Sequence, residues 1–353
     1  MLLKRIARKV LRAFSFFKYS HEISNLLKKV NGQKAIIWGS PNHTNLGDQA
    51  QTFCIEKWVR RYLDSYTHIT FFQINSPKQR AHLLKILKKY VTDYDLIICH
   101  SGYHFCEMYP LHEQYEDLMR LFPDNKIIVF PQTVNFEKES EIIKSAEILN
   151  THKDCTLLCR DAISYKTALN FYKCKLYLYP DIVTSLIGSY KYSNKNRNGI
   201  LFCLRNDKEA LYDRNVLNDF MQSLEGYKCD VTDTNAPEKL KYVVENRQKV
   251  IENKLEQFSK YRIVVTDRYH GTIFSLIAGT PVIVISSTDH KLSSGVDWFA
   301  LPEFKNYIFF AKDLDDVKNI ITNRYSKFPE NQLSSYFENS YYGKLKQLLF
   351  PVN

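Results

Sequence analysis

The chain has 353 residues, enough for two domains, and its 44% hydrophobic and 25% charged residues are typical of a globular protein. The formal net charge is +11, but residues 1–29 hold eight basic residues against one acid, Glu22, so they supply +7 and the rest only +4. The body of the protein is therefore not strongly basic, and the composition does not favour a nucleic-acid partner.

Residues 1–29 interleave basic and apolar side chains at helical spacing, which predicts a helix with one apolar and one basic face. Two interpretations stay open: a helix that lies on an anionic membrane surface, or a solvated basic helix packed on the body. The interleaved charges are unlike a signal peptide, and no apolar run is long enough to span a bilayer. We expect a cytoplasmic protein, peripheral at the inner face of the plasma membrane under the first interpretation.

The eight cysteines are scattered, without a CxxC pair or a second pair at zinc-type spacing. Several lie inside apolar runs, such as Cys99 and Cys203. We interpret them as reduced, buried residues of a cytoplasmic protein.

Residues 30–190 alternate short apolar runs with amphipathic segments, which predicts a parallel sheet with helices on both faces. The third predicted strand is expected to end at Pro131. The predicted strands cover residues 35–38, 95–99, 126–130, 156–159 and 176–178, and the predicted helices 48–62 and 111–121.

A polar stretch over residues 190–198 predicts a linker, and a second α/β unit follows over residues 199–330. The amphipathic segment 331–353 is expected to form a helix that packs back on the first domain. Two parallel-sheet domains that face each other leave a cleft at the carboxyl ends of their strands, where ligands bind. The predicted strands of the second unit cover residues 199–204, 262–265 and 281–285, and its predicted helices 216–224 and 238–258.

The most informative motif is the turn after the strand at 262–265, where an apolar run stops abruptly at Asp267, Arg268 and His270. A second apolar-periodic segment follows Gly271, so the pattern predicts a strand, a tight turn and a helix N-terminus. A helix N-terminus suits an anion, Arg268 offers a fork of donors, and His270 can move a proton at neutral pH. The motif predicts a phosphate or carboxylate site with acid–base chemistry.

The turn after the first strand carries Asn45, Gly47 and Asp48 and can bring backbone N–H groups against an anion. Asp48 could be a general base or could cap the following helix. Asn45 could orient a hydroxyl group or make an Asx turn.

Further candidates follow predicted strands or lie in the last loop. His100 and His104, near the end of a predicted strand, are suggestive, but a lone histidine is more often structural. Arg205 is well placed to hold a phosphate or carboxylate bidentately. Lys291 could neutralise a phosphate or be a solvated loop lysine. The histidine spacing does not match a metal-binding helix such as HExxH, and we expect no metal.

Taken together, these motifs resemble the polysaccharide pyruvyl transferase family, in order from about residue 36 to residue 300. One departure is Ser101-Gly102-Tyr103, where the family often has a glycine-rich run. The matching motifs are Asn45-Leu46-Gly47-Asp48, Phe130-Pro131-Gln132, Arg160-Asp161 with Ser164, Tyr179-Pro180-Asp181, Thr266-Asp267-Arg268-Tyr269-His270-Gly271, Ala278-Gly279-Thr280-Pro281-Val282, and Lys291 with Asp297-Trp298-Phe299.

The resemblance implies a fold similar to the two-domain glycosyltransferase B type, with residues 30–190 on the acceptor side and 199–330 on the donor side. It implies transfer of the pyruvyl group of phosphoenolpyruvate to two hydroxyls of a sugar, as in exopolysaccharide or capsule biosynthesis. Phosphoenolpyruvate is then a substrate, no cofactor is needed, and the acceptor is a glycan or lipid-linked oligosaccharide. Arg205, Arg268 and His270 would contact the donor, with His270 as acid or base and Asp48 as acceptor base.

Two other classes of function remain as alternatives. One is a glycosyltransferase of the same architecture that binds the pyrophosphate of a nucleotide-sugar at the same helix N-terminus. The other is a non-catalytic assembly protein that kept the fold.

Overall fold

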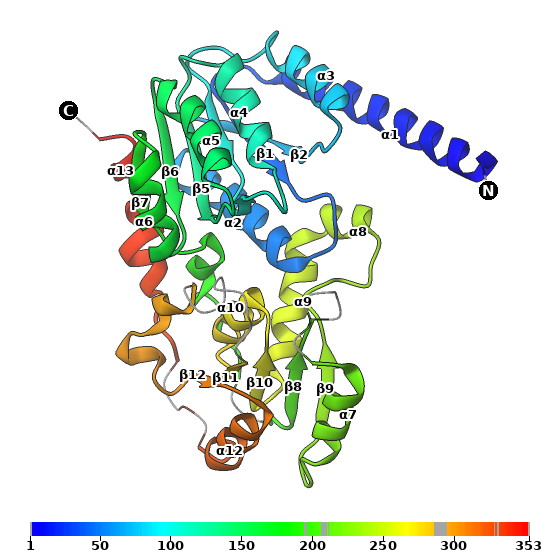
Figure 1. Cartoon of the computed structure of the whole chain (residues 1–353), viewed down its shortest axis with the longest axis vertical. Helices are drawn as coiled ribbons and strands as arrows, with labels where there is room; N and C mark the ends of the chain where they lie inside the picture. The colour runs from blue at the N-terminus through cyan, green and yellow to red at the C-terminus, as the bar shows by residue number, and fades with distance from the viewer. Residues whose placement is uncertain are drawn as a thin grey trace.

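Two parallel β-sheets form the centres of two α/β domains, one above the other in Figure 1, which confirms the predicted fold class. The computed structural model describes residues 2–193, 196–205, 210, 212–285, 295–327, 329 and 332–351, with the backbone alone for residues 2–14.

The first domain is built on a sheet of seven strands in the order β2-β1-β3-β5-β6-β7, with β4 paired to β5 and every pairing parallel. The central strands are buried along their length, which explains their unbroken apolar runs. The strands are β1 (Lys34–Ser40), β2 (Thr67–Phe72), β3 (Leu96–Cys99), β4 (Gly102–Phe105), β5 (Ile127–Val134), β6 (Cys155–Cys159) and β7 (Lys175–Leu178). The helices are α1 (Leu2–Lys29), α2 (Leu46–Tyr62), α3 (Pro77–Leu87), α4 (His112–Leu121), α5 (Glu139–Thr151), α6 (Ala162–Phe171) and the 3-10 turn η1 (Ile182–Leu186).

The second domain is built on a five-stranded parallel sheet in the order β12-β11-β10-β8-β9. Its strands are β8 (Ile200–Cys203), β9 (Cys229–Thr232), β10 (Ile263–Thr266), β11 (Val282–Ile285) and β12 (Ile308–Ala311). Its helical segments are α7 (Arg214–Gln222), α8 (Leu240–Glu245), α9 (Arg247–Ser259), α10 (Tyr269–Ile277), η2 (Val296–Phe299), η3 (Pro302–Phe304) and α12 (Leu314–Arg324), and the chain ends with η4 (Glu338–Tyr342) and α13 (Gly343–Leu349).

Each sheet has one point where the chain reverses its direction of travel across the strands. The chain runs from β1 outward to β2 and then crosses to β3 on the other side of β1; in the same way β9 and β10 flank β8. In sheets of this kind ligands bind at the carboxyl ends of the strands beside the reversal. His100 directly follows β3, and Asp267 directly follows β10, so candidate residues fall at both reversals.

The structure corrects several predicted boundaries. β5 does not end at Pro131 but continues to Val134, because a register shift between Val129 and Gln132 removes the need for a ladder N–H at the proline. Helix α2 begins two residues before Asp48, since Asn45 caps it. The predicted helix over 238–258 is two helices, interrupted at Asn246, whose φ of −121° and ψ of 29° are not helical.

Four strands were missed, and three of them lie at sheet edges: β2, β9 and β12. Edge strands are only partly buried, so they lack the long apolar run that marks a central strand. The fourth, β4, is a short strand beside β5 that contains Tyr103 and His104.

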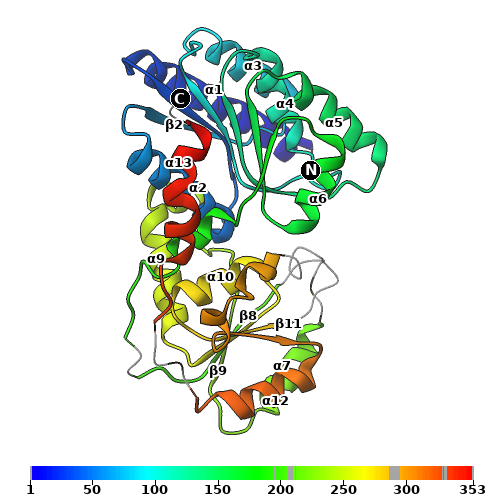
Figure 2. The ribbon, with the colours of Figure 1, turned by 90° about the vertical axis from the view of Figure 1, so that its left-hand side faces the viewer.

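One hydrophobic cluster runs through both domains, from Ile55 of α2 to Ile251 of α9 and Phe274 of α10. The C-terminal segment belongs to the same cluster and lies beside α2 in Figure 2. There the Trp58 indole N–H donates to the Tyr342 carbonyl oxygen at 2.9 Å. The two sheets therefore share a core.

The two ends of α1 have different surroundings. Ile23 and Leu27 are buried in the core of the first domain, and the Tyr19 hydroxyl accepts a hydrogen bond from the Phe72 N–H at 3.0 Å. Phe17 is 61% exposed, and the N-terminal part of the helix extends past the body in Figure 1. No helix among the described residues is long and apolar enough to cross a membrane.

A buried ion pair joins the two domains beside the shared core. Arg247, the first residue of α9, donates to both carboxylate oxygens of Glu56 on α2 at 3.2 Å and to the Gln49 side-chain oxygen at 2.9 Å. The Thr70 hydroxyl donates to the same carboxylate at 2.7 Å. The side chains of Arg247 and Glu56 are only 10% and 15% exposed.

We expect Arg247→Met to lower the free energy of unfolding by about 3 kcal/mol, because it leaves the Glu56 carboxylate buried without its cation. Denaturant unfolding of the purified variant measures the loss. Arg61→Met is the matched control: Arg61 pairs with Glu338 but is 60% exposed, so its removal should cost less than about 1 kcal/mol. Equal losses in the two variants would contradict a role for the Arg247 pair in holding the domains together.

Candidate functional site

A cleft of about 830 Å³ lies between the domains, at the carboxyl ends of both sheets. Six of the residues predicted from sequence line it: Asn45, Asp48, His100, Arg205, Arg268 and His270. Of the remaining predicted residues, Gly47 lies beneath His270 and Asp267 lies behind Arg205, whereas Lys291 falls outside the described residues.

His270 is the second residue of α10 and packs against the first turn of α2. A Cβ atom added at Gly47 would lie 2.3 Å from His270 Nδ1, so only glycine permits this approach. The imidazole is 11% exposed, with its Nε2 atom buried and 3.6 Å from the Asp181 Oδ2 atom. The N-terminal turns of α2 and α10, one from each domain, therefore meet at this ring.

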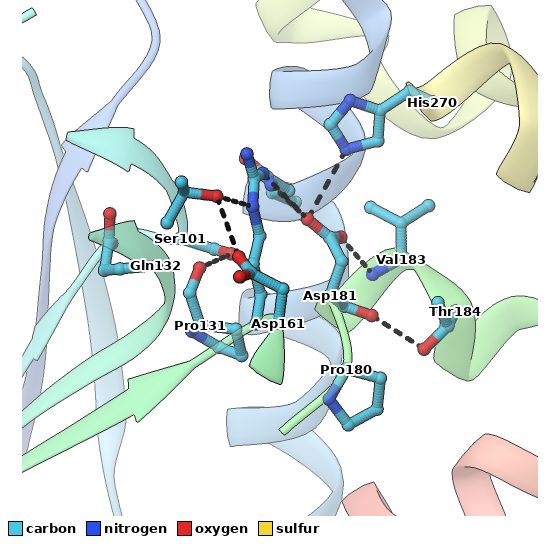
Figure 3. A network of polar contacts seen from close by, with 12 residues as sticks. Ser101, Pro131, Gln132, Asp161, Pro180, Asp181, Val183, Thr184 and His270 are labelled. Atoms are coloured by element: carbon cyan, nitrogen blue, oxygen red, sulfur yellow. Dashed lines mark hydrogen bonds and ion pairs between the residues drawn. The ribbon is translucent and has the colours of Figure 1, made fainter. Parts of the chain in front are cut away.

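Asp181 is the buried anion behind His270, as Figure 3 shows. Its carboxylate accepts hydrogen bonds from the Gln51 side-chain amide at 2.6 Å and from the Val183 N–H at 3.0 Å. The Arg160 guanidinium lies 3.7 Å away. Burial by itself disfavours the charged form, but the contacts with His270, Arg160 and Val183 outweigh it and lower the pKa of Asp181 from 3.8 to about 2.

An ionised Asp181 orients the imidazole. Among the described residues, no atom lies within hydrogen-bonding distance of His270 Nε2, and the 3.6 Å to Asp181 is an ion-pair distance. A buried Nε2 that faces a carboxylate carries a proton. Nε2 of His270 therefore faces Asp181, and Nδ1 lies on the side of the ring that packs against Gly47.

Asp267 binds the backbone of Arg205 at the end of the neighbouring strand. Its Oδ1 atom accepts a hydrogen bond from the Arg205 N–H at 2.9 Å, which ties the ends of β8 and β10 together. Burial raises the pKa of Asp267 above its usual value. The residue thus supports the loop that presents Arg205 to the cleft.

Arg268 lines the cleft but is already bound to a carboxylate. Its Nε and one terminal nitrogen both donate to Asp233 at 2.9 Å, in a bidentate pair. Asp233 follows the edge strand β9. An anionic ligand that uses this fork must therefore compete with Asp233.

The turn before α2 is tied to the second domain. The Asn45 side-chain oxygen accepts from the Gly47 N–H at 2.9 Å, which is the capping contact of α2. The Leu46 N–H donates to the Thr234 carbonyl at 2.8 Å, and the Ala236 N–H to the Thr44 carbonyl at 2.9 Å. Asn45, rather than Asp48, therefore caps the helix.

Asp48 lies in the first turn of α2 at the cleft surface. Its side chain is 32% exposed, and its Oδ2 atom lies 3.7 Å from His43 Nε2. This position leaves the carboxylate accessible from the cleft.

His100 is held rigidly in the floor of the cleft. Its Nε2 lies 2.8 Å from the Thr52 hydroxyl, and its Nδ1 lies 2.6 Å from the Ser101 carbonyl. Burial lowers the pKa of His100 to about 4, so the ring is neutral at pH 7. Both ring nitrogens have protein partners, which fits a structural role.

Sequence reasoning gave Asp181 and Arg160 no firm role and did not single out Asp233 or Gln51. The ends of predicted strands did draw attention to Asp181 and Arg160. Asp233 follows an edge strand that the apolar pattern did not reveal, and Gln51 gave no signal beyond its position on α2, one turn after Gly47.

Within the described part of the chain, no group of three His, Cys, Asp or Glu side chains is placed to hold a metal ion. The polar residues that line the cleft are arginines, histidines, residues with amide or hydroxyl side chains, and the two acids Asp48 and Glu113. Such donors suit an anionic organic ligand.

The architecture defines a class of protein. HepE of Anabaena, solved in complex with UDP and glucose, superposes with a TM-score of 0.56 at 8% identity, covering 89% of this chain and 100% of that one. The two-domain fold is of the glycosyltransferase B type. At this identity the likeness shows the fold alone.

The family follows from the sequence comparison. The family model for polysaccharide pyruvyl transferase matches residues 45–290, and the chain belongs to this family. General stress protein 30 of Bacillus subtilis is 26% identical over 297 residues, which is 82% of this chain and 83% of that protein. Pyruvyl transferase 1 of Schizosaccharomyces pombe is 27% identical over 289 residues, which is 77% of this chain and 69% of that protein.

The lowered pKa of Asp181 makes a prediction about stability. A carboxyl group whose pKa is lower in the folded than in the unfolded state stabilises the fold above the unfolded value, 3.8, and this contribution is lost as the pH falls through about 2. The size is about 2 kcal/mol. Asp181→Asn should remove this pH dependence.

We test this pH dependence by measuring the free energy of unfolding of the wild type and of Asp181→Asn from pH 5 down to pH 2. The difference between the two proteins should shrink by about 2 kcal/mol across this range, since the wild type alone loses the contribution. A constant difference would show that Asp181 is not the anion described above.

Proposed function

We propose that this protein transfers the pyruvyl group of phosphoenolpyruvate to two hydroxyls of one sugar in a polysaccharide or its lipid-linked precursor. The products are a pyruvate ketal and phosphate. Family membership supports pyruvyl transfer to a polysaccharide. The observation that carries the proposal is His270, which lies in a cleft lined by four arginines and is backed by a buried, ionised Asp181.

The donor carries a phosphate and a carboxylate, and the cleft offers arginines that can hold both. Arg160, Arg205 and Arg268 line it, and Lys291 belongs to the same sequence motif but lies outside the described residues. When phosphoenolpyruvate binds, the Arg268 guanidinium donates to one of its phosphate or carboxylate oxygens instead of to the Asp233 carboxylate. This exchange keeps a buried guanidinium paired in both states.

The chemistry needs a proton donor next to a carbon atom. His270 gives a proton to the methylene carbon of phosphoenolpyruvate, which becomes a methyl group, and positive charge develops at the central carbon. Asp181 stabilises the imidazolium that is needed before this transfer. A sugar hydroxyl then adds to the central carbon and gives its proton to Asp48.

The second half of the reaction removes phosphate. The central carbon now bears the methyl, the carboxylate, the phosphate ester oxygen and the first sugar oxygen. Phosphate leaves with the electron pair of its C–O bond and takes the proton held by Asp48. The second hydroxyl of the sugar then adds to the central carbon, and its proton returns to His270. Two hydroxyl protons are thus exchanged for one new C–H bond and one protonated phosphate.

We expect His270→Ala to lower kcat for phosphate release from phosphoenolpyruvate by about 10²–10⁴-fold, the usual contribution of a positioned acid or base. The assay mixes the protein with phosphoenolpyruvate and a panel of glycosides and follows phosphate. His21→Ala, an exposed histidine of α1, is the control and should retain full activity.

Two results would contradict the proposal. Nucleotide release from a nucleotide-sugar, with no phosphate from phosphoenolpyruvate, would identify a glycosyltransferase instead. Pyruvate ketals that persist in the polysaccharide of a His270→Ala strain would identify a non-catalytic assembly protein.

We further infer that the projecting part of α1 holds the protein at an anionic membrane. The basic residues of this part form one face in sequence, whereas Tyr19, Ile23 and Leu27 anchor the rest of the helix to the body. Each basic residue near such a surface contributes about 1 kcal/mol. The basic residues that precede the anchored part are Lys4, Arg5, Arg8, Lys9 and Arg12.

Replacing these basic residues by Gln should lower partitioning onto phosphatidylglycerol-containing vesicles by about fivefold for each charge removed. Co-sedimentation of the full-length protein measures it, with phosphatidylcholine vesicles as the control. Binding that is unchanged in the Gln variant, or insensitive to salt, would contradict the inference. Removing residues 1–29 would be a poor test, because it would also strip Ile23 and Leu27 from the core.

A further inference from the structure

One wall of the cleft is aromatic and has no role in the chemistry above. It is formed by β4 and the loop before α4, where Tyr103, Met108 and Tyr109 line the cleft. Met108 is 61% and Tyr109 46% exposed, and the two tyrosine rings lie edge to face with centroids 6.3 Å apart. Large apolar surface that faces a cleft, rather than the core, is typical of a binding surface.

This wall is held in place by its own hydrogen bonds. The Asn135 side-chain amide donates to the Tyr103 hydroxyl at 2.7 Å. The Tyr109 N–H donates to Cys106 Sγ at 3.3 Å, and the Leu111 N–H to the Tyr109 carbonyl at 2.6 Å. Binding therefore needs little ordering of the loop.

His104 stands beside Tyr103 in the same wall and is fixed from three sides. Its N–H donates to the Gln132 side-chain oxygen at 3.3 Å, and its carbonyl lies 2.9 Å from His112 Nδ1. Its own Nδ1 lies 2.6 Å from the Tyr115 hydroxyl.

The Tyr115 hydroxyl decides the tautomer of His104. This hydroxyl donates its only proton to the His100 carbonyl at 3.1 Å, so it can only accept from His104 Nδ1. The proton of the neutral ring is then on Nδ1, and Nε2 has a lone pair. Burial lowers the pKa of His104 well below its usual value, which keeps the ring neutral.

Gly102 leaves the His104 Nε2 atom uncovered. Its φ of +148° favours glycine, and a Cβ atom at this position would lie 2.9 Å from Nε2. The sequence Ser101-Gly102-Tyr103-His104 thus combines an aromatic ring, an open hydrogen-bond acceptor and the glycine that exposes it.

The surroundings of this wall are uncharged or internally neutralised. The Gln73 side-chain amide donates to the Asn42 side-chain oxygen at 2.9 Å, and the Asn42 side-chain amide donates to the Gln73 backbone carbonyl at 3.3 Å. Arg80 is paired with Asp117 at 2.6 Å and with Glu113 at 3.8 Å. The wall therefore suits a neutral ligand with an apolar face and hydroxyl groups, which is the chemistry of a pyranose ring.

We propose that Tyr103, Met108 and Tyr109 stack against a sugar ring of the acceptor glycan, while the His104 Nε2 atom accepts a hydrogen bond from one of its hydroxyls. That this sugar is the acceptor rests on the proposed function; that the wall binds a sugar does not. Tyr115 is a positioning residue, because it acts on the ligand only through His104.

Sugar binding is tested first, without phosphoenolpyruvate. Saturation-transfer NMR with methyl galactoside, methyl glucoside and methyl mannoside avoids the aromatic aglycone of nitrophenyl glycosides, which would itself stack on tyrosine. We expect Tyr109→Ala to weaken binding of the preferred glycoside by about tenfold. Tyr94→Ala is the matched control, since Tyr94 is 78% exposed outside the cleft, and it should bind like wild type.

The hydrogen bond is tested by a pair of substitutions at His104. Gln can place an acceptor oxygen near the Nε2 position, whereas Leu cannot. We expect His104→Leu to raise the acceptor KM by about tenfold and to leave the phosphoenolpyruvate KM unchanged, and His104→Gln to stay within about threefold of wild type. A rise of both KM values together would indicate a merely structural role and overturn the assignment.

The outcomes separate this inference from the proposed function. Wild-type protein that binds a methyl glycoside through Tyr109 but releases no phosphate from phosphoenolpyruvate would refute the proposed function and keep the sugar site. Phosphate release that is unaffected in Tyr109→Ala, or no saturation transfer from the wild-type protein to any glycoside, would overturn the sugar site.

Discussion

The contact between Gly47 and His270 is the constraint on which the rest of the site depends. It brings together the first turns of α2 and α10, one from each domain, with no space for even a methyl group between them. Such an approach is possible only if the two domains keep one relative position. The shared hydrophobic cluster and the Arg247–Glu56 pair hold that position. The packing of the domains therefore also fixes the position of His270, the proposed proton-transfer group.

Asp181 orients the His270 ring that forms this contact. The desolvation cost of a fully buried carboxylate must be offset by hydrogen-bond donors or cations. Here they come from Gln51, Val183 and Arg160, together with His270. Gln51 belongs to α2, Val183 to η1 and His270 to α10, so three elements converge on one carboxylate. Because these donors hold Asp181 ionised, the ring orientation of His270 does not depend on a ligand. This is preorganisation in the usual sense: the charges are in place before the substrate arrives.

Much of this arrangement was predictable from sequence, and the reason is the topology of parallel sheets. Central strands are continuous apolar runs, so the turns after them mark the predicted residues. Six of these line one cleft: Asn45, Asp48, His100, Arg205, Arg268 and His270. What the sequence did not reveal are pairings set by tertiary structure. Asp233 follows an edge strand without an apolar pattern, and nothing local indicates that it binds Arg268. Similarly, the tautomer of His104 depends on Tyr115, eleven residues away on another element.

The Arg268–Asp233 pair links ligand binding to the connection between the domains. Asp233 accepts from the Thr234 N–H at 2.6 Å, and the Thr234 carbonyl in turn accepts from the Leu46 N–H at the start of α2. A donor anion that takes the guanidinium from Asp233 leaves this carboxylate with its hydrogen bonds to Thr234 and Asn235. These hydrogen bonds still partly compensate the negative charge of Asp233. Because its side chain is 21% exposed, water can also hydrate the carboxylate. Exchange of one anion for another at Arg268 then costs far less than the burial of an unpaired arginine, which is why an arginine in a closed pair can still serve as a ligand-binding group.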